Sequence, residues 1–174
     1  MKQILIILLI VISQLKSNAA MAAEQNTILL KTFDDWQVMY KIDKDDIKHC
    51  IVIAAAAHSV GFIGFRETPK AMFSYIKKNK SFTFSMDVGF VINQMEVIKV
   101  MIGNKVFYLK PYRDFFAYTY NNEDDQELIF ALLQDRKMMR IRTVSQELIV
   151  VNDYYNFKSI DKAFNFIKLN SNCN

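Results

Sequence analysis

Residues 96–109, EVIKVMIGNKVFYL, decide the fold class of this chain. Two apolar runs, Glu96 to Ile102 and Lys105 to Leu109, flank the pair Gly103-Asn104. Glycine accepts the positive φ that a tight turn requires, so this arrangement predicts a β-hairpin. We therefore expect antiparallel strands joined by short turns.

The same two-residue period recurs on both sides of the hairpin. Trp36, Val38 and Tyr40 alternate with their neighbours, which is typical of a half-buried strand. Ser81 to Met86 alternates in the same way. Further strands are expected at 28–33, 50–57, 71–76, 115–120, 138–144 and 147–151.

Helical spacing is confined to the later part of the chain. One helix is expected from about residue 122, with Asn122 or Asp124 as its cap, and another after Ser159. Together these patterns predict a mainly β chain, an antiparallel β-sandwich with one or two short helices near the C-terminus.

The first 23 residues have the pattern of an export leader. Lys2 gives a positive start, Ile4 to Ile12 is an apolar run of nine residues, and small residues occupy 19–23. A membrane-spanning helix needs roughly 20 apolar residues, so the run is too short to cross a bilayer. We expect cleavage after Ala22, with cleavage after Ala20 or Ala23 as the alternatives, which leaves residues 23–174 as a single domain with no transmembrane segment.

The mature chain has little excess charge. The net charge of +4 falls to +2 without the two leader lysines, Lys2 and Lys16, because the leader contains no acid. A nucleic-acid partner is therefore not expected, since such proteins concentrate basic residues on one face. The local run at 77–80, KKNK, is interpreted as a solvated turn, with an anionic surface partner as the alternative.

Export changes the meaning of the two cysteines, Cys50 and Cys173. An even number of cysteines in an oxidising compartment predicts one disulfide between them. Two free thiols and an intermolecular bond remain as alternatives. Catalysis by a Cys-His pair is not expected, because His49 and Cys50 are neighbours on a strand and point to opposite faces.

No other pattern indicates catalysis, a cofactor or a metal. Two histidines without clustered cysteines do not form a zinc site. The acidic run at 43–46 lacks the glycine and glutamate of a calcium loop, so it is interpreted as a solvated turn. We therefore predict no catalytic, cofactor-binding or metal-binding residue.

Aromatic residues supply the candidates for partner binding. Trp36 is expected to fill the core, as a lone tryptophan on an alternating strand usually does. Tyr112, Tyr118 and Tyr120 could be displayed near Pro111, and exposed tyrosines suit protein binding. Packing within the domain is the alternative for these three.

Several short motifs, taken in order, resemble the invasion-associated locus B family of exported bacterial proteins. They are FDDWQV at 33–38, His49-Cys50, Gly103-Asn104, DYYNF at 153–157 and the terminal Cys173, and the resemblance spans roughly residues 30–173. The chain departs from the family at Tyr118, where tryptophan is common, and at Ser159, where glycine is common. The resemblance implies an immunoglobulin-like β-sandwich, export, an association with host-cell entry and no defined catalytic activity.

These observations together predict an exported, non-enzymatic protein. It would act by contact with a protein partner in the cell envelope, at the cell surface or on a host cell. The alternatives are a periplasmic housekeeping or assembly factor without host contact and, less favoured, a hydrolase of unrecognised type. We expect the protein to be located in the periplasm, at the cell surface or, if secreted, in the medium.

Overall fold

The computed structural model describes residues 27–42, 48–61, 64–135, 138–171 and 173. The predicted leader and the acidic turn at 43–46 lie outside the described residues. The strands are β1 Thr27–Phe33, β2 Trp36–Ile42, β3 Lys48–Ala55, β4 His58–Val60, β5 Lys70–Ile76, β6 Ser81–Asp87, β7 Ile98–Ile102, β8 Lys105–Tyr112, β9 Phe116–Thr119, β10 Met138–Val144 and β11 Val150–Asn156. The helices are α2 Asn122–Asp135 and α3 Ile160–Leu169, with a short 3-10 turn, η2, at Lys77–Asn79.

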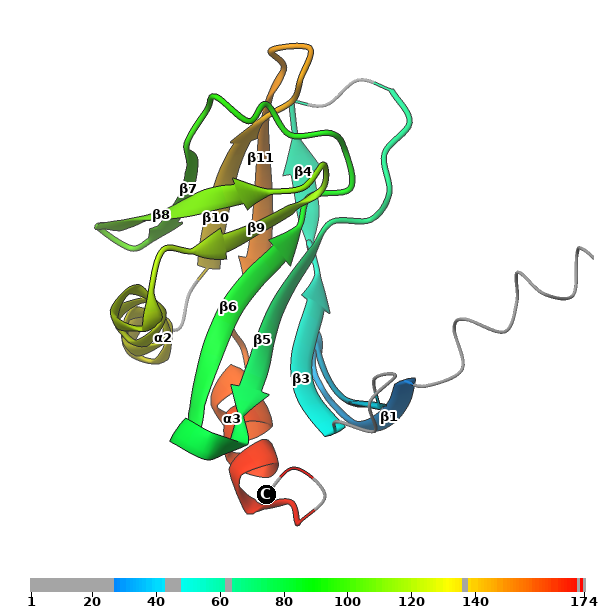
Figure 1. Cartoon of the computed structure of the whole chain (residues 1–174), viewed down its shortest axis with the longest axis vertical. Coiled ribbons are helices and arrows are strands. Elements are labelled where there is room, and N and C mark those ends of the chain that lie inside the picture. The colour runs from blue at the N-terminus through cyan, green and yellow to red at the C-terminus, as the bar shows by residue number, and fades with distance from the viewer. Residues whose placement is uncertain (1–26, 43–47, 62–63, 136–137, 172, 174) are drawn as a thin grey trace, which may run out of the picture.

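The strands form one antiparallel sheet in the order β1-β2-β3-β5-β6-β9-β8-β7-β10-β11-β4. β3 and β4 are two residues apart in the chain, although β3 pairs with β5 and β4 pairs with β11. The Ala57 amide, between them, donates to the carbonyl of Tyr154 in β11 at 2.7 Å. The sheet therefore curls so that β4, the last strand in the sheet order, continues β3, the third strand (Figure 1).

The predicted class, mainly antiparallel β with two helices, is confirmed. α2 lies beside the β8–β9 region, and α3 lies at the lower end of the molecule, close to the C-terminus (Figure 1). Hydrogen bonds join all strands of the described residues into one sheet. The finer description as an immunoglobulin-like sandwich of two facing sheets therefore stays a prediction.

The predicted hairpin is β7–β8, with Ile102 paired to Lys105 across Gly103-Asn104. Gly103 has φ of +55°, and a Cβ there would collide with the side chain of Asp135 at the end of α2. The positive φ of the turn therefore favours glycine here, and a larger residue would also displace the Asp135 side chain.

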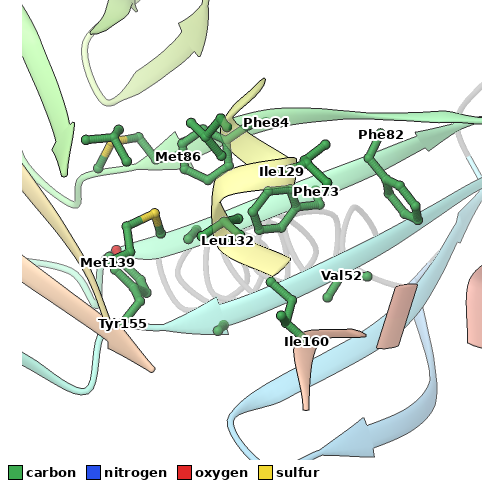
Figure 2. Packing of buried hydrophobic residues seen from close by; sticks show 14 of the residues in the cluster. Val52, Phe73, Phe82, Phe84, Met86, Ile129, Leu132, Met139, Tyr155 and Ile160 are labelled. Carbon is green, nitrogen blue, oxygen red and sulfur yellow. The ribbon is translucent and has the colours of Figure 1, made fainter. Parts of the chain in front are cut away.

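The core is aromatic, as the composition predicts. Trp36 is fully buried, and its side chain packs against Phe73, with ring centroids 5.7 Å apart. Phe73 also contacts Phe84 at 4.9 Å and Phe164 of α3 at 5.1 Å. Figure 2 shows Leu132 and Ile129 of α2 among the same buried side chains. The expectation that Trp36 fills the core is confirmed.

Two of the motifs that carry the family resemblance touch each other. The indole of Trp36 donates to the backbone carbonyl of Asn156 at 2.9 Å, and the side-chain Nδ2 of Asn156 donates to the Asp35 carboxylate at 3.0 Å. The Ser159 hydroxyl donates to Asp34, which lowers the pKa of that carboxyl. Thus the β1–β2 turn is fastened to the segment that links β11 to α3.

The two predicted helix caps have different outcomes, because Ser159 does hold the N-cap position of α3, whereas the predicted cap of α2 was wrong. Ser159 precedes α3 but has φ of +63° and makes no capping bond, because its hydroxyl is bound to Asp34. At α2 the cap is Asn121, whose side-chain oxygen accepts from the Asp124 amide at 2.9 Å, rather than Asn122 or Asp124. β11 also begins later than predicted, at Val150, because residues 145–149 form the preceding turn.

The predicted disulfide is present between Cys50 of β3 and Cys173, with Cα atoms 5.6 Å apart. Both residues are buried. The bond joins the chain just beyond α3 to a central strand, across 123 residues of sequence. The two sulfur atoms are bonded to each other, so no free cysteine remains in the described residues.

Candidate protein-binding face

The outer side of β8 carries exposed aromatic residues. Phe107 and Leu109 point into the core, so the alternating positions Val106, Tyr108 and Tyr112 face outward. β8 runs three residues beyond Leu109, where the sequence pattern had suggested that it ends. This extension places Tyr108 and Tyr112 on one strand face.

β9 adds two more tyrosines to this side. Tyr118 is paired with Lys110, and Tyr120 follows the strand, so the same register places it opposite Tyr108. The rings of Tyr112 and Tyr118 meet edge to face, with centroids 5.4 Å apart. Tyr108, Tyr112, Tyr118 and Tyr120, here called the tyrosine face, are each between 41% and 57% exposed.

The structure therefore brings the three sequence candidates Tyr112, Tyr118 and Tyr120 onto one surface. Tyr108 was missed by the sequence reasoning. Its signal was the two-residue period from Val106 to Tyr112, which continues through Pro111 because that residue pairs with Ala117 in β9.

A groove of about 590 Å³ runs beside the tyrosine face, between β8 and α2. Tyr108, Tyr120 and Val106 line its strand side, and Asp124 and Glu127 line its helix side. A second hollow, of about 420 Å³, lies further along and is lined by Pro111, Tyr112 and Tyr118. The surface thus offers pockets for side chains rather than a flat sheet.

Asp125 holds α2, and with it the helix side of the groove, in place. Its carboxylate is buried and accepts hydrogen bonds from the Phe84 amide at 2.6 Å and the Thr119 hydroxyl at 2.7 Å. Burial raises the pKa of Asp125, although both hydrogen bonds oppose that shift. The helix is therefore tied to β6 and to β9 by one side chain.

A second buried polar group surrounds Asp153, in the middle of β11. Arg66 makes a bidentate ion pair with Asp153, at 2.8 and 2.6 Å, and the Ser59 hydroxyl donates to the same carboxylate at 2.6 Å. The Arg66 guanidinium also donates to the carbonyl of Val88 at 2.6 and 2.8 Å. The side chains of Arg66 and Asp153 are 7% and 0% exposed, so this group fixes loops and is closed to a substrate.

Two further titratable side chains, Tyr155 and His58, are held in separate contacts. The Tyr155 hydroxyl is buried, and burial together with the Asp153 charge raises the pKa of this phenol. His58 stacks on Tyr154, with centroids 4.3 Å apart. No group of three potential metal ligands occurs within the described ranges.

Comparison with known proteins identifies a similar solved structure. No family model matches the sequence, and no curated protein matches it. The crystal structure of invasion associated protein B from Bartonella henselae superposes with a TM-score of 0.55, covering 79% of this chain and 94% of that one. This chain has the fold of invasion associated protein B. Sequence identity to invasion associated protein B is 9%, so the likeness establishes the fold alone.

The resemblance to the invasion-associated locus B family is thereby supported at the level of the fold. In the part of the chain that the structure describes, no helix is long and apolar enough to cross a bilayer.

Proposed function

We propose that this chain is an exported, non-enzymatic protein that acts by binding a protein partner through the tyrosine face. The observation that carries the proposal is the gathering of four half-exposed tyrosines on one hairpin, beside a groove. Tyrosine is enriched among the residues that dominate binding energy at protein interfaces. Its large ring loses little side-chain entropy when it is immobilised.

Three further observations support export and a role outside the cytoplasm. The first 23 residues have the pattern of a signal peptide. The Cys50–Cys173 disulfide suits an oxidising compartment. The protein of the same fold from Bartonella henselae is described as invasion associated, which favours a partner in the cell envelope or on a host cell.

Photo-cross-linking tests the binding surface. We would replace Tyr120 by p-benzoylphenylalanine in the exported protein and irradiate living cells. A discrete cross-linked species is expected for this position and not for Lys78, an exposed residue in the turn between β5 and β6. Equal yields at the two positions would count against a specific face.

Alanine variants measure the contribution of the tyrosines. The double variant Tyr108→Ala/Tyr120→Ala is expected to weaken capture of the cross-linked partner at least about tenfold, since two interface tyrosines contribute about 1–2 kcal/mol each. Tyr154→Ala is the matched control, because Tyr154 stacks on His58 away from the hairpin. Unchanged capture by the double variant would refute the proposal.

Protease treatment of intact cells separates the two cellular roles. Degradation of the protein by added protease supports display at the surface. Complete protection, together with release by osmotic shock, would place the contact inside the envelope and favour the housekeeping or assembly role. Retention of the leader on the mature protein would contradict export by cleavage.

A further inference from the structure

Another hollow lies at the end of the sheet where four connecting loops meet. It has a volume of about 640 Å³ and is lined by aromatic rings and carboxylates, chiefly Phe65, Phe90, Phe115, Glu67 and Glu147. The segments come from the β4–β5, β6–β7, β8–β9 and β10–β11 connections. Figure 1 shows the β10–β11 turn and the loops after β4 and β6 at this same end of the molecule.

The loops around this hollow, here called the end pocket, are tied together by backbone hydrogen bonds. The pairs are Glu67 amide to Gly89 carbonyl at 3.1 Å, Val88 amide to Phe115 carbonyl at 2.9 Å, and Gln146 amide to Val91 carbonyl at 2.9 Å. Gly89 has φ of +71°, and a Cβ there would collide with the Glu67 carbonyl. The pocket is therefore preorganised, which limits the entropy lost when a ligand binds.

The buried ion pair between Arg66 and Asp153 lies beneath the end pocket. Arg66 lies between the lining residues Phe65 and Glu67, and its side chain turns inward to Asp153 and to the Val88 carbonyl. Its guanidinium lies 4.9 Å from the centroid of the Phe90 ring. Because its charge is matched by Asp153, Arg66 does not neutralise the two glutamates of the pocket.

The lining therefore has an uncompensated negative charge among aromatic rings. Glu67 and Glu147 are both exposed, and none of the nine lining residues is basic. Phe65 is 93% exposed and Phe115 is 42% exposed. Aromatic faces attract cations, and nearby carboxylates strengthen that attraction.

We propose that the end pocket binds the cationic group of an arginine or lysine side chain on a partner polypeptide. The aliphatic part of such a side chain would contact the phenylalanine rings while its charged end meets the glutamates. An anionic bilayer would be repelled by the same two carboxylates, so the charge favours a basic polypeptide over a lipid surface. This site is distinct from the tyrosine face and does not depend on it.

The test follows backbone amides of the isotopically labelled, disulfide-bonded mature protein by NMR. The probe is the capped peptide Gly-Gly-Arg-Gly-Gly, and its control contains citrulline, which keeps the shape of arginine without its charge. We expect the arginine peptide to shift the amides of Gly89, Val91 and Gln146 and to leave Tyr118 unchanged. The citrulline peptide is expected to bind at least about fivefold more weakly.

Three variants locate the charge that is responsible. Glu67→Gln and Glu147→Gln are each expected to weaken binding about two- to fivefold. Glu123→Gln makes the same change in the first turn of α2, at a residue that lines neither the end pocket nor the groove beside the tyrosine face, and should have no effect. All three glutamates are exposed, so none of these variants is expected to disturb folding, and thermal unfolding checks this.

Several outcomes would overturn the proposal. Equal binding of the citrulline peptide would make the site a non-polar one, and unchanged affinity in both pocket variants would place the peptide elsewhere. Tighter binding to phosphatidylglycerol vesicles than to phosphatidylcholine vesicles would indicate a lipid surface. Concentration-dependent self-association that Glu147→Gln abolishes would make the occupant a second copy of this chain, whose 77–80 turn is basic.

Discussion

Removal of the Cys50–Cys173 disulfide should destabilise the whole domain rather than its C-terminal tail alone. The bond closes a loop of 123 residues, which includes most of the sheet and both helices. In the chain-entropy description, opening a loop of that length frees the unfolded state by about 5 kcal/mol at 25 °C. Since a domain of this size is stable by only about 5–15 kcal/mol, we expect a large loss.

The experiment compares the wild-type protein with Cys50→Ala/Cys173→Ala in urea. Alanine avoids placing a hydroxyl at two buried positions. The single tryptophan, Trp36, is fully buried, so its fluorescence reports global unfolding. We expect the double variant to lose about 3–5 kcal/mol and to be insensitive to reductant, whereas reductant should bring the wild type close to the variant.

A loss below about 1 kcal/mol would refute this reasoning. It would mean that the bond only holds the segment after α3 to β3. In that case reduction should increase amide exchange in α3 while the exchange of β5 and β6 stays unchanged. The slope of the urea dependence gives a further check, because a more expanded unfolded chain exposes more surface and steepens it.

Three further changes test the buried polar groups. Tyr155→Phe should leave stability unchanged or raise it by about 1–2 kcal/mol, because the Tyr155 hydroxyl is buried without a hydrogen-bond partner among the described residues; a loss above about 1 kcal/mol in urea unfolding would contradict this. Arg66→Met should lower the free energy of unfolding by about 3–5 kcal/mol, because it leaves Asp153 buried and unpaired. The double variant Arg66→Met/Asp153→Leu should recover part of that loss, and a double variant less stable than Arg66→Met would contradict this expectation. Because burial raises the pKa of Asp125, its protonated form stabilises the folded state at low pH, and this contribution is lost as the pH rises through the raised pKa. Unfolding measured from about pH 4 to about pH 7 should therefore show the wild type losing stability relative to Asp125→Asn. The same pH dependence in the two proteins would contradict this expectation.

Periodicity was enough to locate most of the sheet. The alternation at Trp36, Val38 and Tyr40 and the Gly103-Asn104 turn both correspond to observed strands, since a two-residue period reflects one buried and one exposed face. β4 was not anticipated. It has only three residues, His58–Val60, and it is a strand because β11 lies beside it, so no local pattern encodes it.

The two surfaces differ in how far the sequence could reveal them. Tyr112, Tyr118 and Tyr120 were recognisable as candidates because tyrosines near a proline suggest display. The end pocket was not recognisable, because the ion pair beneath it joins Arg66 to Asp153 across 87 residues and the rim of the pocket comes from separate loops. Contacts of that separation depend on the topology of the whole sheet.

The continuity of β3 with β4 has a consequence for the modularity of this domain. The backbone from β3 to β4 pairs with β5 through β3 and with β11 through β4, so neither half of the sheet is a separable unit. A fragment that ends before β11 would leave β4 without its partner strand and would also lack Cys173. We therefore expect fragments to be unfolded, and mapping of either surface has to use point variants in the whole chain.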